Sequence, residues 1–396
     1  MTAVAPAFRR DRVVHGWIAL KGISDAGDAA WMIALAWSAV NIASPTVAGL
    51  IVTAGTVPRA LTLLVGGVLA DRFDPRRLMI ATTAVRILVL LGALVALTSV
   101  GETLAVLFTV AIAFGMCDAL FEPSSASLTR QLVREDDFAA LAGVGQTVSR
   151  LGGMLGAAAG GALVAWGGLA AAAAANAVTY TAVLAYLIAV LRVRFPRAPA
   201  PPQRMLGAVA SGFGYLRRNG LARSLVLSLL GLNLCVSPAM SIGLALLVKQ
   251  MGTGPTALGA LQTTFGIGAM AGALVFVRFR PARPALVGFV LLVVQGLAVA
   301  SFAFGIVPVA FATCVVIGLT AGGASTILGA LFMRTIAADG IGRVASIQRL
   351  GDDGLMPAAT AAFGAIAAIS LPVTFLLFGS AMSAYMATTA LRWRRR

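Results

Sequence analysis

The residues most able to do chemistry are two pairs of acidic side chains embedded in apolar sequence. Asp25 and Asp28 are three residues apart, and Asp118 and Glu122 are four apart. Such spacings place each pair on one face of a helix. Ionisable residues in long apolar segments are costly to keep there and mark functional sites by default. The pairs predict proton binding, because a carboxylate in a dry site can hold a proton and release it when water or a cation arrives.

Arginines at a comparable depth in the apolar sequence leave a second interpretation open. Buried charges are usually paired, so Arg86 or Arg150 could hold Asp28 or Asp118 in a purely structural network. We nevertheless expect at least one carboxylate to act in proton coupling. Asn233, a neutral polar residue in another apolar segment, is predicted to join helices or to contact a substrate.

The sequence offers little for other kinds of chemistry. It contains one histidine and three cysteines, and the cysteines lie in apolar segments without metal-ligand spacing. A Gly-x-x-x-x-Gly-Lys-Ser/Thr loop for ATP is missing. We therefore expect no catalytic residues, no metal and no cofactor, so the chain is not predicted to be an enzyme. A proton gradient is the expected driving force.

The composition places these residues in a membrane. The chain has 396 residues, of which 59% are hydrophobic and 11% are charged, whereas a soluble domain carries roughly a quarter charged residues. A hydrocarbon core of about 30 Å needs about 20 helical residues to cross it. We predict an all-α membrane protein with twelve transmembrane helices, at residues 16–38, 45–70, 78–98, 104–128, 140–165, 169–191, 221–248, 256–277, 284–304, 307–333, 343–369 and 371–391.

The arginines between the predicted spans lie in connections on one side of the membrane. Every second connection between the predicted spans contains arginine, while the intervening connections hold only Lys249 as a basic residue. By the positive-inside rule, both termini are then cytoplasmic. The net charge of +16 follows from this sorting. The predicted partners are therefore membrane lipids and not nucleic acid, since no basic face interleaved with aromatic residues is present.

The segment 192–220 separates two sets of six spans. Its first part is basic and rich in proline, as expected of a semi-rigid linker, and residues 205–218 are predicted to form an interfacial helix. The predicted domains are thus an N-terminal six-helix bundle at 1–191, this linker, and a C-terminal six-helix bundle at 221–396.

The connection after the second predicted span contains a recognisable motif. Residues 66–77 read Gly-Gly-Val-Leu-Ala-Asp-Arg-Phe-Asp-Pro-Arg-Arg and resemble the signature loop of the major facilitator superfamily. Asp74 stands where that loop has a glycine. The resemblance implies the major facilitator fold, with this loop as a cytoplasmic gate between two six-helix bundles. The gate-loop residues that match are Gly67, Asp71, Arg72, Arg76 and Arg77.

The second half of the chain contains a similar sequence at the equivalent position. Residues 278–283 repeat Arg, Phe, Pro and Arg at the spacing of residues 72–77, each after the second span of its half. The match supports a parallel duplication, in which two bundles are related by an axis along the membrane normal.

A row of glycines in the fifth predicted span allows close helix contact. Gly152, Gly156 and Gly160 are four residues apart, and Gly161 follows them. The row resembles the antiporter motif of the same superfamily, with Ala157 in place of its proline. Generic small-residue packing is an equal alternative.

Two further stretches narrow the resemblance. Residues 24–37 and 57–77 resemble the branch of bacterial exporters for macrolides and the siderophore enterobactin. This implies a bacterial inner-membrane protein that exports drug-like or siderophore-like small molecules in exchange for protons, by alternating access. Exporters of this superfamily usually carry a buried arginine in the fourth span, where this chain has Asp118 and Glu122 and no arginine. The departure puts the usual proton mechanism of the family in doubt.

Two other functions remain open at this point. The same fold could import a small metabolite or let it pass without proton movement. A non-transporting membrane scaffold or sensor is the third hypothesis, and the absence of an appended soluble domain argues against it. We expect the protein to act as a monomer.

Overall fold

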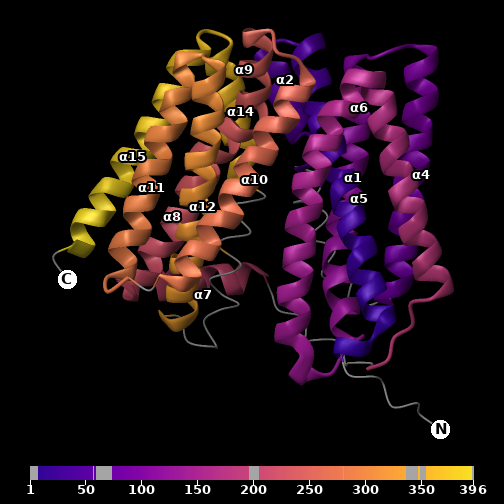
Figure 1. Ribbon diagram of the computed structural model, residues 1–396, viewed down its shortest axis with the longest axis horizontal. Helices are drawn as coiled ribbons and strands as arrows, with labels where there is room; N and C mark the ends of the chain where they lie inside the picture. The colour runs from indigo at the N-terminus through magenta and orange to yellow at the C-terminus, as the bar shows by residue number, and fades with distance from the viewer. Residues whose placement is uncertain are drawn as a thin grey trace. The chain divides into compact units, whose positions relative to one another are not determined.

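The computed structural model describes residues 8–56, 58, 74–195, 205–279, 281–335, 347 and 354–394 (Figure 1). Every secondary-structure element in these residues is helical. Eight of these helices are long and apolar enough to cross a membrane. Each of the twelve predicted spans overlaps a helix. The prediction of an all-α membrane protein is therefore confirmed.

Contacts between helices divide the chain into two compact units. Unit 1 consists of the described parts of Met1–Ser38 and Ala54–Pro202, and unit 2 of those of Ala39–Thr53 and Gln203–Arg396. Unit 2 therefore includes the last turn of α1 (Arg12–Ile42) and all of α2 (Pro45–Thr53), which lie within the sequence range of the predicted N-terminal bundle.

Three long helices accompany α1 in unit 1. Asp74 and Pro75 start the first of them, because proline suits the first helical position and the Asp74 side chain accepts a hydrogen bond of 2.9 Å from Arg77 N. Thr103 caps the next one by accepting a hydrogen bond from Val106 N. The elements are η1 (Phe8–Arg10), α4 (Pro75–Ser99), α5 (Leu104–Arg130), η2 (Glu135–Asp137) and α6 (Phe138–Ala189).

The 52 residues of α6 form two helical arms, because the backbone leaves the helical conformation at Gly167 and Gly168. Gly168 has φ of 63°, a conformation that glycine adopts readily and other residues rarely adopt. As α1 advances from residue 22 to 30, its contacts on the first arm advance from residue 152 to 160. As α1 advances from residue 16 to 27, its contacts on the second arm recede from residue 186 to 176. The arms are therefore antiparallel and correspond to two of the predicted spans.

The glycine row of the first arm lies directly against α1. A Cβ atom at Gly152 would lie 2.2 Å from the carbonyl oxygen of Gly22, and one at Gly156 would lie 2.1 Å from that of Ala26. One at Gly160 would lie 2.6 Å from a backbone atom of α1. The two helices are thus in backbone contact, which sets the position of every functional side chain on α1.

Unit 2 is packed in the same way. A Cβ at Gly322 of α12 would lie 1.9 Å from a carbonyl oxygen of α10, and one at Gly364 of α14 would lie 2.5 Å from the Pro45 oxygen of α2. Lys249 Nζ donates to the Val40 carbonyl oxygen at the end of α1. The elements are α7 (Met205–Arg218), α8 (Gly220–Pro238), the π-helical turn η3 (Ala239–Gly243), α9 (Leu244–Met251), α10 (Pro255–Arg278), α11 (Pro284–Ser301), η4 (Phe302–Phe304), α12 (Val307–Thr335), α14 (Met356–Ala367) and α15 (Leu371–Arg394).

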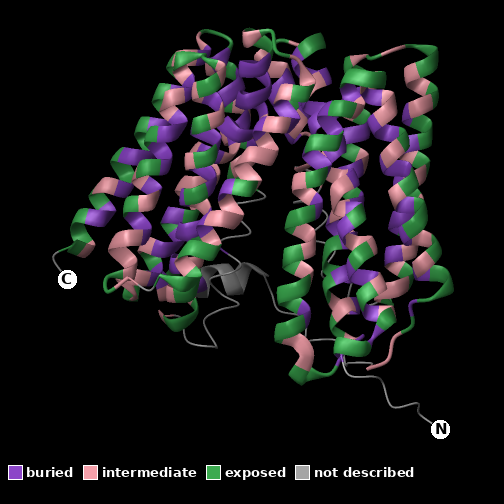
Figure 2. Cartoon of the chain, in the orientation of Figure 1, coloured by how far each residue is buried: buried purple, intermediate pink, exposed green. Residues whose placement is uncertain are grey.

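Apolar side chains also cover outward faces of the helices, as expected of a lipid-facing surface. On α4, Val85, Leu88, Leu91 and Val95 recur every three or four residues and are 46 to 68% exposed. Figure 2 shows exposed and buried residues alternating along α4 and α15. Close helix contacts at small residues are thus combined with an apolar exterior.

Candidate functional site

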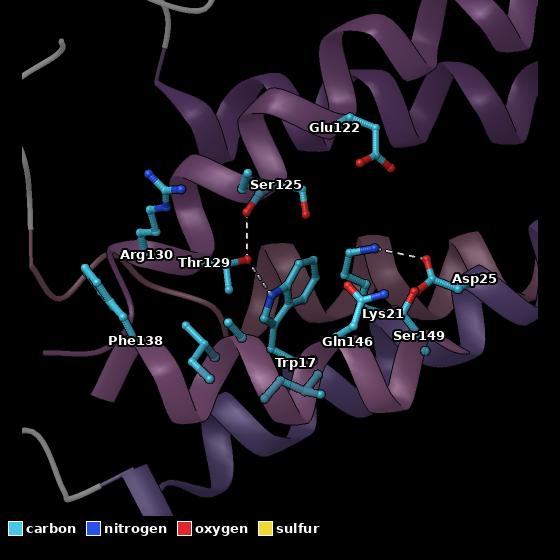
Figure 3. Close-up of a pocket in the computed structure, with 16 residues that line it drawn as sticks. Trp17, Lys21, Asp25, Glu122, Ser125, Thr129, Arg130, Phe138, Gln146 and Ser149 are labelled. Atoms are coloured by element: carbon cyan, nitrogen blue, oxygen red, sulfur yellow. Dashed lines mark hydrogen bonds and ion pairs between the residues drawn. The ribbon is translucent and has the colours of Figure 1, made fainter. Parts of the chain in front are cut away.

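A pocket of about 590 Å³ lies within unit 1. Its walls are the first half of α1, the last turns of α5 and the beginning of α6 (Figure 3). The volume falls within the range of about 300–1,000 Å³ that is typical of small-molecule sites. The pocket can therefore hold an organic molecule of drug-like size.

α1 presents Trp17, Lys21 and Asp25 to this pocket at intervals of four residues, which place them on one helix face. Lys21 Nζ and Asp25 Oδ1 form an ion pair of 3.0 Å along the helix. Asp25 Oδ2 is buried and has no hydrogen-bond partner among the described residues. Trp17 Nε1 donates to Thr129 Oγ1 at 3.1 Å, which holds the indole ring against α5. An apolar ring and a charged pair thus line the same wall.

The opposite wall carries further charge. Glu122 projects from α5 on the side of the pocket opposite Lys21 and Asp25 (Figure 3). Arg130 follows two turns later on α5, and Gln146 of α6 adds an amide. Two carboxylates and two cations therefore surround the space, together with apolar side chains. Such a lining suits an amphipathic organic molecule that carries charge or hydrogen-bonding groups.

Asp28, one helical turn beyond Asp25, contacts the second arm of α6 instead of the pocket. Its Oδ1 accepts a hydrogen bond from the Tyr180 hydroxyl and another, of 3.3 Å, from Asn176 Nδ2. Tyr180 and Asn176 are almost fully buried. The hydrogen-bond donors described for this carboxylate are thus both neutral, and the Arg86 guanidinium also acts on it electrostatically.

Arg86 of α4 and Asp118 of α5 form an ion pair beside this carboxylate. Arg86 is only 2% exposed, and its guanidinium lies 4.3 Å from the ring centre of Phe121 and 5.2 Å from that of Tyr180. Cation–π contacts of this kind stabilise a buried arginine. Tyr180 therefore links the two carboxylates, since its hydroxyl binds Asp28 and its ring faces the guanidinium bound to Asp118. We call Asp28, Asn176, Tyr180, Arg86 and Asp118 the buried polar network.

Local packing fixes the geometry of this network. A Cβ at Gly27 would lie 2.3 Å from Asn176 Oδ1 and 2.6 Å from Thr179 Oγ1, so only glycine lets α1 approach the second arm so closely. Thr179 Oγ1 donates to Asn176 Oδ1 at 3.0 Å, which turns the amide nitrogen towards Asp28. Phe114 stacks on Trp31 at 5.5 Å between ring centres and lies tilted against Tyr180 at 6.1 Å, so aromatic rings pack against the network.

The structure separates the predicted site residues into groups. Asp25 and Glu122 line the pocket, whereas Asp28, Asp118 and Arg86 belong to the buried polar network. Of the pairings left open by the sequence, the one formed is Arg86 with Asp118. The remaining predicted residues lie elsewhere: Arg150 is exposed on α6, and Asn233 is partly buried on α8 of unit 2.

Sequence reasoning missed Tyr180, which joins both carboxylates of the network. A signal was present, because Asn176 and Tyr180 are four residues apart in an otherwise apolar segment and so share a helix face. Trp17 was also missed as a pocket residue. It lies on the helix face of Lys21 and Asp25, but nothing in the sequence places Thr129 beside it.

Part of the predicted gate loop, namely Gly67, Asp71 and Arg72, lies outside the described residues. The remaining two residues stand at the start of α4. Arg76 donates from Nε to the Leu187 carbonyl oxygen at 2.9 Å and from Nη2 to that of Ile188 at 3.0 Å, which satisfies carbonyls at the end of α6. Arg77 donates its backbone N–H to Asp74, the residue that replaces the usual glycine.

The sequence model of the Major Facilitator Superfamily matches residues 22–359. The chain belongs to the major facilitator superfamily. It is therefore a multi-pass membrane transporter with the major facilitator fold. A search of curated protein sequences gave no match.

Solved structures of this superfamily's fold agree along nearly the whole chain. The nucleoside transporter NupG has a TM-score of 0.72 at 12% identity, and the comparison covers 97% of this chain and 100% of NupG. A bacterial homologue of the iron transporter ferroportin, in its inward-facing state, has a TM-score of 0.72 at 17% identity and covers 99% of this chain and 100% of its own. At such identities the likeness establishes the fold.

Proposed function

We propose that this superfamily member exports drug-like or siderophore-like small molecules in exchange for protons, by alternating access. The observation that carries the proposal is that the pocket and the buried polar network share two helices. Asp25 and Asp28 lie one turn apart on α1, and Glu122 and Asp118 lie one turn apart on α5. In each pair, one carboxylate lines the pocket and the other belongs to the network.

Asp28 is the proposed proton carrier. Asp118 forms a direct ion pair with the Arg86 guanidinium, whereas the hydrogen-bond donors described for Asp28 are the neutral groups of Tyr180 and Asn176. Hydrogen bonds to an ionised carboxylate are roughly twice as strong as those between neutral groups. Proton uptake by Asp28 therefore weakens the contact of α1 with the second arm of α6, and proton release restores it. The protonation state of one side chain thus controls the packing of a helix that also carries the pocket.

The pocket is the proposed substrate site of this half of the transporter. A substrate cation would compete with Lys21 for Asp25 and gain a second contact from Glu122, while its apolar part would lie against Trp17. Movement of α1 on substrate binding would also move Asp28, because the helix turn that joins Asp25 to Asp28 is rigid. Substrate binding and proton binding are then coupled through the same helix.

The branch of exporters for macrolides and enterobactin supplies the substrate class and direction, through the resemblance of residues 24–37 and 57–77. The alternation of arginine supports the placement of both termini in the cytoplasm, and the resemblance to bacterial exporters supports a location in the bacterial inner membrane. We propose a monomer that needs no cofactor beyond the proton gradient.

Reconstituted full-length protein tests the proposal. Proteoliposomes with an internal pH dye and a fluorescent organic cation report proton and substrate movement together under an imposed pH gradient. We expect gradient-driven substrate accumulation with proton counterflow. Asp28→Asn should lose the gradient dependence but keep substrate binding, measured as quenching that the Trp17→Phe variant lacks.

Glu102→Gln is the matched control, since it neutralises an exposed carboxylate in the α4–α5 connection and should transport normally. Substrate movement without proton movement would instead identify an importer or facilitator. Neither movement nor quenching with any probe would favour a scaffold or sensor. Gradient-driven transport by Asp28→Asn at the wild-type rate would show that Asp28 is structural.

A further inference from the structure

A second pocket lies within unit 2. It has a volume of about 510 Å³ and is formed by the beginning of α8 and the end of α15. In Figure 1 the end of α15 and the helix α7, which directly precedes α8, lie at the lower side of unit 2. The pocket is thus at the ends of two helices, where a membrane-embedded surface meets the headgroup region.

Two arginines stand at this pocket without any described acidic partner. Arg223 comes from α8 and Arg392 from α15, and both are exposed. Neither 138–338 nor 354–396 contains an Asp or a Glu, so the part of unit 2 that the structure describes has no acidic residue. The pocket is therefore positively charged, and no described residue of its own unit neutralises it.

The pocket is also built by specific contacts that join the two helices. Trp393 Nε1 donates to Ser224 Oγ at 3.2 Å, and Ser224 Oγ donates to the Gly220 carbonyl oxygen at 3.0 Å. Asn219 caps α8 by accepting a hydrogen bond of 3.1 Å from Ala222 N. A Cβ at Gly220 would meet nothing within 4 Å, so α8 is open at its first residue. Backbone N–H groups at a helix start attract anions.

Apolar side chains also line the pocket. Leu227 and Leu391 are 42% and 58% exposed, and Tyr385 is 36% exposed. At about 1.5 Å per helical residue, Tyr385 lies about 10 Å before Arg392 along α15. The site therefore combines an anion-binding end with an apolar wall that runs into the membrane-spanning part of the helices. A free phosphate ion would leave that wall unused.

The geometry points to a binding site for an anionic phospholipid, with the headgroup phosphate between Arg223 and Arg392 and an acyl chain along Leu227 and Tyr385. Tryptophan and tyrosine are favoured at this depth of a membrane, and basic pockets between transmembrane helices bind anionic headgroups. A lipid held here would connect the first helix of the C-terminal half to its last. This inference does not depend on the direction or coupling of transport.

Fluorescence of Trp393 tests the site in the full-length protein. Two kinds of nanodisc would contain phosphatidylcholine and phosphatidylglycerol at the same fixed ratio. Bromine, which quenches tryptophan on contact, is carried by the acyl chains of phosphatidylglycerol in one kind and of phosphatidylcholine in the other. The signal of Trp393 is the difference between wild type and Trp393→Phe. We expect brominated phosphatidylglycerol to quench Trp393 more than brominated phosphatidylcholine does at equal mole fraction.

The double variant Arg223→Gln/Arg392→Gln should lose this preference, with phosphatidylglycerol binding about thirtyfold weaker for two cations at the membrane surface. Arg223→Lys/Arg392→Lys retains the charge and should retain most of the preference. Arg278→Gln/Arg283→Gln removes two exposed arginines from the ends of α10 and α11 and serves as the matched control, with an unchanged preference.

Three outcomes would overturn the proposal. Equal quenching by both brominated lipids in wild type would show that no anionic lipid is selected. An equal loss of preference in the control variant would show a general surface-charge effect. Displacement by inorganic phosphate, but not by chloride at matched ionic strength, would assign the pocket to a free anion.

Discussion

Replacing Gly156 by alanine tests the contact between α1 and the first arm of α6, on which the position of Asp25 and Asp28 depends. The added Cβ would lie 2.1 Å from the Ala26 carbonyl oxygen and 2.6 Å from Ala26 Cα. Both atoms belong to the backbone of α1, so no side-chain rotation relieves the overlap. An ordinary van der Waals contact begins at 3.4 Å. The two backbones must therefore part by 1.3 Å, the difference between 3.4 Å and the 2.1 Å that separates the added Cβ from the Ala26 carbonyl oxygen.

Two effects of opposite sign decide the result. Alanine is favoured over glycine within a helix by about 1 kcal/mol, while overfilling a packed interface costs about 1–3 kcal/mol. Gly153 separates these effects, because a Cβ there meets nothing within 4 Å on the same helix. Both alanine variants gain the helical preference, and only Gly156→Ala overfills the interface. We expect Gly156→Ala to be less stable to unfolding than Gly153→Ala by about 1–3 kcal/mol.

Denaturant titration of the purified protein in detergent, followed by tryptophan fluorescence, measures this difference in free energy of unfolding. Gly153→Ala should be as stable as wild type or slightly more stable. Substrate quenching of Trp17 should weaken in Gly156→Ala alone, because the displaced α1 forms one wall of the pocket. Equal stability and equal quenching in the two variants would refute the backbone contact and with it the placement of α1.

Two further predictions concern helix ends. Asp74→Ala removes the cap that binds Arg77 N and should lower the free energy of unfolding by about 1 kcal/mol. Asp74→Ser should restore most of this stability. An alanine variant as stable as wild type would exclude the cap. Lys249→Met removes the hydrogen bond to the Val40 carbonyl oxygen and should increase amide hydrogen exchange over the last turn of α1 and over α2. Lys249→Arg is the control. Unchanged exchange in Lys249→Met would show that this bond does not hold the segment.

Where the structure describes them, the predicted membrane spans coincide with helices because their cause is local. A stretch of about 20 apolar residues must form a helix in a bilayer, whatever its neighbours are. Helix ends follow from short-range chemistry as well, as at Pro75 and at the left-handed Gly168. The one long helix that merges two predicted spans, α6, folds back at that glycine, so the two-span prediction describes it correctly.

The partition of the charged residues could not be predicted in this way. Asp25 and Asp28 are three residues apart, so their side chains point about 60° apart around the helix. This angle suffices for one to line the pocket and the other to contact the second arm of α6. Which neighbour occupies each direction depends on how the helices pack, and a helical spacing contains no such information.

The amino-acid pattern thus determined that this is a helical membrane protein, where its spans lie, and that two acidic pairs and a row of glycines lie in spans of the N-terminal half. Only the folded chain decided that Arg86 pairs with Asp118, that Tyr180 joins this pair to Asp28, and that Arg223 and Arg392 meet at one pocket. The physical reason is the range of the interactions. Hydrophobicity and capping act within a few neighbouring residues, whereas these contacts join helices up to 169 positions apart, as between Trp393 and Ser224.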